Sequence, residues 1–166
     1  MQAGKSSIQF EHPPIITSAA SIVGQTEGEG PLASFFDRVE PDPTFGKKSW
    51  EEAESELQRQ TVQKCLDKAG RQAADVNCLF AGDLLGQIVA SSFGVESFDI
   101  PFFGLYGACS TMGEAMILGA MAAGAGYADR VLALASSHFA SAERQFRFPL
   151  AYGNQRPQST TWTVTG

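Results

Sequence analysis

The residue best placed to do chemistry in this chain is a cysteine at the predicted start of a helix. Cys109 lies in the run Gly107-Ala108-Cys109-Ser110-Thr111, between an apolar segment at 100–105 and a small-residue segment at 110–126. These patterns predict a strand, a tight turn and a helix. Unpaired N–H groups and the positive end of the helix dipole would stabilise a thiolate there, or would bind an anion. The turn is therefore predicted to hold either a nucleophile or the floor of an anion site.

Two further polar residues follow predicted strands. Asp83 comes after the strand predicted at 76–81, and His138 comes after the strand predicted at 131–136. Because the carboxyl ends of parallel strands meet at one edge of a sheet, we expect both residues to converge with Cys109. Each has a structural alternative, since aspartate also favours turns and helix caps and a strand-end histidine is often a packed one. The sequence has no CxxC or HxxxH spacing, so we expect no metal site.

The elements that would position these residues alternate along the chain. Strands are predicted at 15–23, 76–81, 100–105, 131–136 and 160–164, and helices at 50–69, 87–93 and 110–126. Ser49 and Glu52 form a capping box for the first helix, and Gly70 ends it. The segments 25–48, with a helical turn at 32–36, and 140–159 are predicted to be loops. This order predicts an α/β fold with a mixed, mostly parallel sheet and helices on both faces.

Composition sets the class of protein. The 166 residues suffice for one domain with a core, and a net charge of −6 argues against a nucleic-acid or anionic-membrane surface. We expect no membrane span and no targeting peptide. Three cysteines without a disulfide pattern favour a reducing, intracellular compartment. Cys65 and Cys78 lie on a helix face and inside a strand, so we expect both to belong to the core.

Several motifs carry a resemblance to a known family. The turn at 107–110 resembles the nucleophile turn of the thiolase and ketoacyl-synthase superfamily, and the chain is most similar to its stage V sporulation protein AD branch. The resemblance covers residues 10–166. The segments that carry it are Phe10-Glu11-His12-Pro13, Gly30-Pro31-Leu32, 79–85, 107–111, Ser136-Ser137-His138 and 142–147, the last followed by Pro149 and Tyr152-Gly153.

The resemblance implies a thiolase-like fold. Proteins of this family are about twice as long and have two similar βαβαβαββ halves packed as a five-layer αβαβα sandwich. Residues 1–166 would form the N-terminal half-domain, with the C-terminal half, and the histidines that thiolases use for acid–base chemistry, absent from this chain. We expect the helix at 110–126 to pack against its counterpart in the second half, and the chain alone to self-associate through that surface.

The resemblance also implies a function. The family is associated with sporulation and with moving dipicolinic acid, as its calcium chelate, into the developing spore. On this basis we expect a non-enzymatic protein that binds dipicolinic acid, with no cofactor of its own and calcium only as part of the ligand. It would be cytoplasmic in the sporulating cell and would lie at the spore inner membrane only through other proteins of the dipicolinate channel. Thiolase-like folds usually form dimers, so we expect a homodimer.

The expected ligand site combines the motifs above. Cys109, Ser110 and Thr111 would form its floor, Asp83 and His138 would flank it, and Tyr106 would supply part of an apolar wall, whereas we expect Phe102, Phe103 and Leu105 to be core. Arg144 could bind a ligand carboxylate, although salt bridges of Arg144 and Arg147 with Glu143 that fix the loop are the favoured structural alternative. One alternative is an acyltransferase with Cys109 as nucleophile and His138 as base. Another is a scaffold that docks membrane partners and whose pocket is vestigial.

Overall fold

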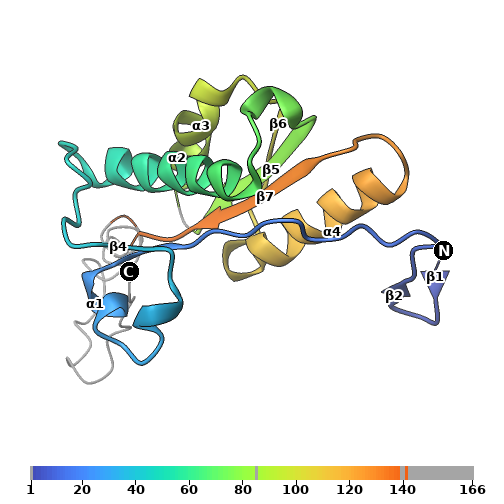
Figure 1. Ribbon diagram of the computed structural model, residues 1–166, viewed down its shortest axis with the longest axis horizontal. Helices are drawn as coiled ribbons and strands as arrows, with labels where there is room; N and C mark the ends of the chain where they lie inside the picture. The colour runs from blue at the N-terminus through green and yellow to red at the C-terminus, as the bar shows by residue number, and fades with distance from the viewer. Residues whose placement is uncertain (1, 85, 139–140, 142–166) are drawn as a thin grey trace, which may run out of the picture.

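A three-stranded parallel sheet forms the centre of the protein (Figure 1). The computed structural model describes residues 2–84, 86–138 and 141. The central strand is β5 (Cys78–Asp83), with β6 (Phe102–Gly104) on one side and β7 (Val131–Ser136) on the other, in the order β6-β5-β7. All six residues of β5 are buried, as expected for a strand that is covered on both faces.

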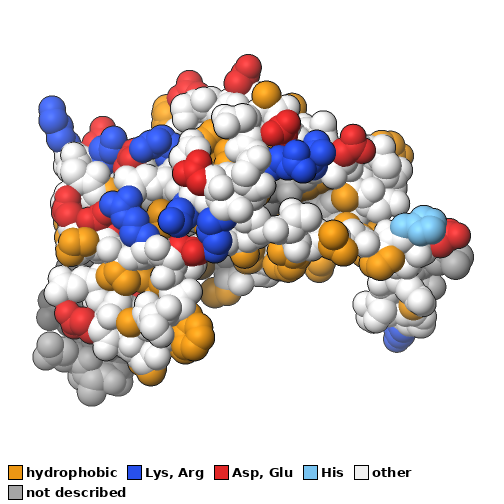
Figure 2. All heavy atoms as spheres, in the orientation of Figure 1, with side chains coloured by type: hydrophobic (Ala, Val, Ile, Leu, Met, Phe, Trp, Pro, Cys, Tyr) orange, Lys and Arg blue, Asp and Glu red, His pale blue; other side chains and the backbone are white. Residues whose placement is uncertain are grey.

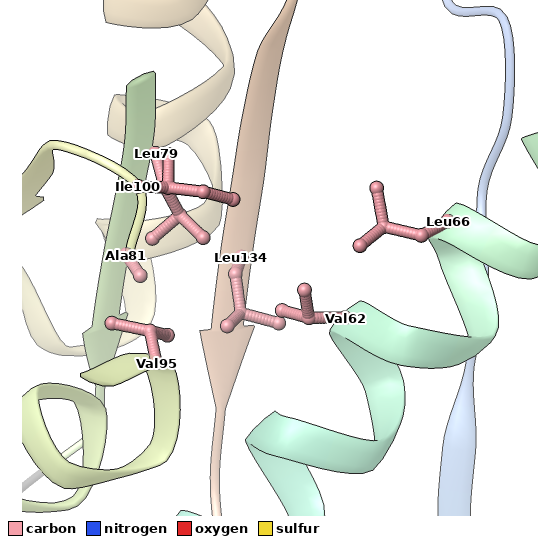
Figure 3. Packing of buried hydrophobic residues seen from close by; sticks show 7 residues of the cluster. All are labelled: Val62, Leu66, Leu79, Ala81, Val95, Ile100 and Leu134. Carbon is pink, nitrogen blue, oxygen red and sulfur yellow. The ribbon is translucent and has the colours of Figure 1, made fainter. Parts of the chain in front are cut away.

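Helices cover both faces of this sheet. Helices α2 (Trp50–Ala69) and α3 (Val89–Val95) pack on one face, and α4 (Thr111–Gly124) packs on the other. Because side chains alternate along a strand, β5 divides its residues between two cores. Figure 3 shows the first core, formed by Val62, Leu66, Leu79, Ala81, Val95, Ile100 and Leu134. The second lies under α4 and is formed by Cys78, Phe80, Ala115 and Ala128.

Helix α2 has the boundaries that its sequence signals predict. The Ser49 hydroxyl accepts a hydrogen bond from the Glu52 N–H at 3.2 Å, and the Glu52 carboxylate accepts one from the Ser49 N–H, also at 3.2 Å. Gly70 ends the helix in the left-handed conformation, with φ of 61°. Both capping predictions are confirmed.

The N-terminal quarter of the chain differs from its prediction. Of the strand predicted at 15–23 only β3 (Ile22–Gly24) forms, and it pairs in parallel with β4 (Arg38–Glu40), inside the segment predicted to be a loop. A reciprocal pair of bonds between residues 21 and 37 fixes this pairing, because Asp37 accepts from the Ser21 N–H and the Ser21 hydroxyl accepts from the Asp37 N–H. The strand β4 is three residues long, too short for a periodic signal.

The strands and helices of the central sheet begin and end within two residues of their predicted bounds. The other elements are short. An N-terminal hairpin stands apart from the sheet in Figure 1. The short elements are β1 (Gln2–Ala3), β2 (Ser7–Ile8), α1 (Gln25–Gly28), η1 (Ala33–Phe35), η2 (Ala73–Asp75), η3 (Glu96–Phe98) and η4 (Ala108–Ser110). The loop predicted at 140–159, apart from Ser141, and the strand predicted at 160–164 lie outside the described residues.

Helix α4 packs closely on the sheet and exposes apolar side chains elsewhere. Ala115 and Gly119 face the sheet, and a methyl group at Gly119 would lie 3.1 Å from Val131. Other positions of α4 carry large apolar side chains that are more than one-third exposed: Met112, Met116, Ile117, Leu118 and Met121. Hydrophobic side chains gather along the lower side of the molecule in Figure 2, where α4 and the segment before β3 run. Within the described residues, a large apolar area of α4 is therefore exposed.

Candidate functional site

The cysteine turn is attached to the carboxyl end of β5. The Leu105 N–H donates to the Ala81 carbonyl at 2.8 Å, which continues the sheet past the end of β6. A methyl group at Gly82 would overlap the Leu105 carbonyl oxygen and lie 2.6 Å from Thr111 Cγ2, so the turn lies directly on the β5 backbone. Ala108 has a φ of 48°, in the left-handed region that alanine rarely adopts. Cys109 follows it and is exposed, at the N-terminal end of α4.

The two hydroxyl groups of the expected ligand floor hold the turn together. Thr111 Oγ1 donates to the Ala108 carbonyl at 2.8 Å and accepts from the Gly107 N–H at 3.3 Å. Ser110 Oγ lies 2.8 Å from the Gly107 carbonyl and 2.6 Å from Glu114 Oε1. These bonds give both hydroxyls a structural task within the turn. A ligand that used them would have to replace these contacts.

Glu114 supplies a negative charge at the start of α4. Its carboxylate folds back over the turn, so that a methyl group at Gly107 would overlap Glu114 Oε1 and Ser110 Oγ. An acidic side chain in the first helical turn is stabilised by the helix dipole. Glu114 therefore occupies the position in which an anionic ligand, or a thiolate of Cys109, would gain most from α4. The helix predicted at 110–126 includes Glu114 in its first turns, but the fold of its side chain back over Gly107 had no sequence signal.

Asp83 is fully buried and bound to the start of α3. It has 0% exposure, and its two carboxylate oxygens accept from the Ile88 N–H at 3.2 Å, the Ser91 N–H at 3.1 Å and the Ser91 hydroxyl at 2.9 Å. These bonds satisfy backbone donors that a helix start leaves unpaired. The structural alternative for Asp83, a turn and cap residue, is thus present in the structure.

His138 is also buried, with 4% exposure, and faces the segment before α2. Its Nε2 atom lies 2.7 Å from the Pro43 carbonyl oxygen, and its ring lies 5.6 Å from the Trp50 ring, tilted by 31°. Because a carbonyl oxygen only accepts, Nε2 carries the hydrogen in this contact. Neither Pro43 nor Trp50 was expected near the site, since both come from a segment distant in sequence.

The structure brings the three predicted residues to one edge of the sheet. Asp83 pairs with Ser136 across β5 and β7, and His138 follows two residues later. The arrowheads of β5 and β7 in Figure 1 point to the end of the molecule at which α4 begins. Tyr106 is half-exposed beside the turn. Phe102 packs against the first core and Leu105 against the second. Phe103 is half-exposed, and its ring stacks on that of Phe80. Arg144, Arg147 and Glu143 lie outside the described residues.

Sequence reasoning missed a polar cluster behind this edge. Glu54 and Gln58 point from α2 toward the sheet, and both are buried, with 2% and 0% exposure. They contact Ser91, Ser136 and Ser141 through hydrogen bonds. Their spacing of four residues on the helix face that carries Val62 and Leu66 was the available signal.

A hollow of about 210 Å³ lies beside this cluster. The segment around Ser21, helix α2 and the end of β7 enclose it. Gln58 Oε1 and Ser137 Oγ are buried here without a hydrogen-bond partner among the described residues.

Two other properties limit the chemistry of the described residues. They contain no group of three His, Cys, Asp or Glu side chains that could hold a metal ion, and burial raises the pKa of the Cys78 thiol, so Cys78 behaves as a core residue.

Comparison with known proteins decides the family. The family model described as Stage V sporulation protein AD matches residues 4–166. The chain is 42% identical over 163 residues to Stage V sporulation protein AD of Bacillus subtilis (strain 168). The chain belongs to the stage V sporulation protein AD family. The aligned region covers 98% of the chain and 48% of the relative, so the chain spans about half the length of that stage V sporulation protein AD.

The family resemblance inferred from the sequence motifs is therefore confirmed, and with it the assignment to sporulation. The described part of this family member contains no helix with both the length and the apolar character that crossing a membrane requires. The α/β class is also confirmed, with a parallel sheet covered by helices on both faces. The edge at which Asp83, Cys109 and His138 meet is the candidate site of this family member.

Proposed function

We propose that this protein binds dipicolinic acid, a flat aromatic dicarboxylate, at the sheet edge that carries Cys109, and that it does so without catalysis. The observation that carries the proposal is the convergence of Cys109, Asp83 and His138 at the carboxyl ends of β5 and β7. Ligands of parallel α/β sheets bind at such edges. Tyr106, half-exposed beside the turn, offers an aromatic surface for a flat ring.

The carboxylates near the turn favour a ligand that carries a cation with it. Glu114 already places a carboxylate at the start of α4, and Asp83 adds a second one behind the turn. A free dicarboxylate would be repelled by these groups, whereas its calcium chelate would carry the neutralising charge with it. We therefore propose the calcium chelate as the bound form. Calcium would come with the ligand, and the protein needs no cofactor.

We also propose the architecture and setting that the family implies. The chain is the N-terminal half of a thiolase-like protein, and the second half covers the exposed apolar side chains of α4. The edge strand β6, with Phe103 half-exposed, is the part of the described sheet best suited to pair with a second copy in a homodimer. The protein acts in the cytoplasm of the sporulating cell and reaches the spore inner membrane through other proteins of the dipicolinate channel.

Alkylation of Cys109 tests whether the ligand binds at the turn. We expect calcium dipicolinate to slow alkylation of Cys109 at least about tenfold at saturation, since a ligand on the turn covers the thiol. The full-length form, meaning this chain extended to the length of the Bacillus subtilis relative, is treated with iodoacetamide and the modified cysteines are quantified by mass spectrometry. Cys65 and Cys78 are internal controls, because one is partly buried and the other buried. Equal rates with and without ligand would contradict binding at this turn.

The alkylation rate of Cys109 also tests the acyltransferase alternative. The exposed thiol at the start of a helix is the observation that favours this alternative. An acyltransferase needs an activated thiolate, and so a fast, pH-dependent reaction near neutrality. We expect a slow reaction, because the Glu114 carboxylate offsets the dipole of α4 at the turn. Glu114→Gln should then accelerate alkylation of Cys109. Fast alkylation of the unmodified protein, unchanged in Glu114→Gln, would favour the acyltransferase.

A further inference from the structure

A buried hydrogen-bond network connects α2 to the segment that carries His138. It runs from Asp83 through Ser91, Gln58 and Ser136 to Glu54, and it ends at Ser141, three residues after His138. The only side chains in it that can titrate are Asp83 and Glu54, with exposures of 0% and 2%. A network of this kind is stable when each contact has one hydrogen.

The Gln58 amide fixes the direction of most of these bonds. Its two N–H groups donate to Ser91 Oγ at 2.9 Å and to Ser136 Oγ at 2.6 Å. Each serine then gives its single hydrogen to a carboxylate, Ser91 to Asp83 at 2.9 Å and Ser136 to Glu54 Oε1 at 2.7 Å. The Asp83 carboxylate therefore acts only as an acceptor in this network, with three donors directed at it.

Ser141 has one hydrogen and two acceptors. Its Oγ atom lies 2.5 Å from Glu54 Oε2 and 3.1 Å from the His138 carbonyl oxygen. If Glu54 were ionised, one of these contacts would bring two oxygen atoms together without a hydrogen. If Glu54 carries a proton on Oε2, it donates to Ser141, and Ser141 donates to His138. Only the neutral acid supplies a hydrogen for both contacts.

The surroundings of Glu54 favour the same form. Burial raises the pKa of Glu54, hydrogen bonds from Ser141 and Ser136 oppose the rise, and the charges of Asp83 and His138 act in opposite directions. The balance is a raised pKa. Asp83 at the end of β5 and His138 beyond β7 are the titratable groups that face Glu54 from neighbouring elements in the described residues.

We propose that Glu54 is a positioning residue: as a neutral acid it fixes the His138 carbonyl through Ser141, and its ionisation takes the Ser141 hydrogen bond away from that carbonyl. The ionised carboxylate would accept the Ser141 hydrogen itself. The His138 carbonyl then loses its bond to Ser141, whereas the contact between Ser141 and Glu54 of α2 is kept with its donor and acceptor exchanged. The step moves one proton from Glu54 to solvent. The proposal concerns the proton on Glu54 and the hydrogen bond of Ser141, and it does not rest on dipicolinate binding.

The protonation state of Glu54 is measured directly in the full-length form by NMR of the labelled glutamate carboxyl carbons. Glu54→Gln assigns the resonance. We expect Glu54 to keep its proton above the ordinary glutamate pKa of about 4.3. Exposed Glu96 lies outside the network and supplies a control variant. Titration of Glu54 at or below the ordinary glutamate value would overturn the proposal without any change to the fold.

The positioning effect has its own readout. Trp50 contacts the His138 ring, so in a Trp162→Phe background its fluorescence reports on His138. We expect a fluorescence step at the pH at which Glu54 titrates. The step should vanish in Glu54→Gln, whose amide donates to Ser141 as the neutral acid does, and persist in the control Glu96→Gln. A step that persists in Glu54→Gln would overturn the proposal. Failure of dipicolinate to bind at any pH would instead refute the proposed function alone.

Discussion

Replacing Asp83 with alanine is expected to lower the free energy of unfolding by about 3 kcal/mol or more, because each buried donor left without an acceptor costs about 1–3 kcal/mol. The substitution removes the acceptor of the Ile88 N–H, the Ser91 N–H and the Ser91 hydroxyl, and Ser91 is fully buried. Ser91 also receives a hydrogen bond from Gln58, so the loss extends into the buried network. The start of α3 should become the weakest part of the fold.

Urea unfolding of the full-length form measures this effect. Asp83→Asn is the informative comparison, because it keeps one acceptor oxygen for Ser91 and should lose less stability than alanine. Exposed Asp129, changed to alanine, is the matched control and should unfold within about 0.5 kcal/mol of the wild type. An Asp83→Ala protein as stable as the control would show that the carboxylate is not required at the start of α3. Loss of ligand binding in a well-folded Asp83→Asn protein would favour a direct ligand role.

A methyl group at Gly82 is expected to have the second large effect. In Gly82→Ala the new methyl would overlap the Leu105 carbonyl oxygen and approach Thr111 Cγ2 to 2.6 Å. Neither atom belongs to the free end of a flexible side chain, so the backbone itself must move. Overpacking of this kind costs about 1–3 kcal/mol, and we expect the upper end of that range. The turn that carries Cys109 would shift away from β5.

Gly113→Ala is the control for this substitution. Apart from the local backbone of α4, no atom of the described residues lies within 4 Å of a methyl group at Gly113, and alanine favours the helix over glycine by up to about 1 kcal/mol. The isolated chain with Gly113→Ala should therefore be as stable as the wild type or slightly more stable. Thermal unfolding and alkylation of Cys109 are measured on both variants. Unchanged stability and an unchanged Cys109 rate in Gly82→Ala would contradict the close packing of the turn on β5.

Much of the sheet and its helices could be predicted from local signals. Helix α2 carries a capping box at Ser49 and a glycine stop at Gly70, and β7 is a run of six residues that the sequence predicted with the same bounds. Such features depend on neighbours in the sequence. The strand β4 was missed because it is three residues long and is defined by its pairing with β3, which no local pattern encodes.

The candidate site shows the same division. The ends of the predicted strands placed Asp83 and His138 at one edge of the sheet, and the structure has both residues there. Their contacts did not follow, because Pro43, Trp50 and Glu54 approach from a segment far away in sequence. Glu114 lies within the helix predicted at 110–126, but the fold of its carboxylate back over Gly107 depends on the conformation of the cysteine turn. The sequence therefore predicted which residues lie at this sheet edge, but not the contacts and charges around them.

A calorimetric titration with dipicolinate, with and without calcium, directly tests whether dipicolinate binds at the cysteine turn. The titration is made on this chain and on the full-length form, each shown to be folded, with Cys109→Trp as the variant that fills the turn. We expect saturable heat in the full-length form, stronger with calcium and absent in Cys109→Trp. Heat in this chain as well would place the whole site in this half. No heat from the folded full-length form, or equal heat in Cys109→Trp, would contradict dipicolinate binding at the cysteine turn.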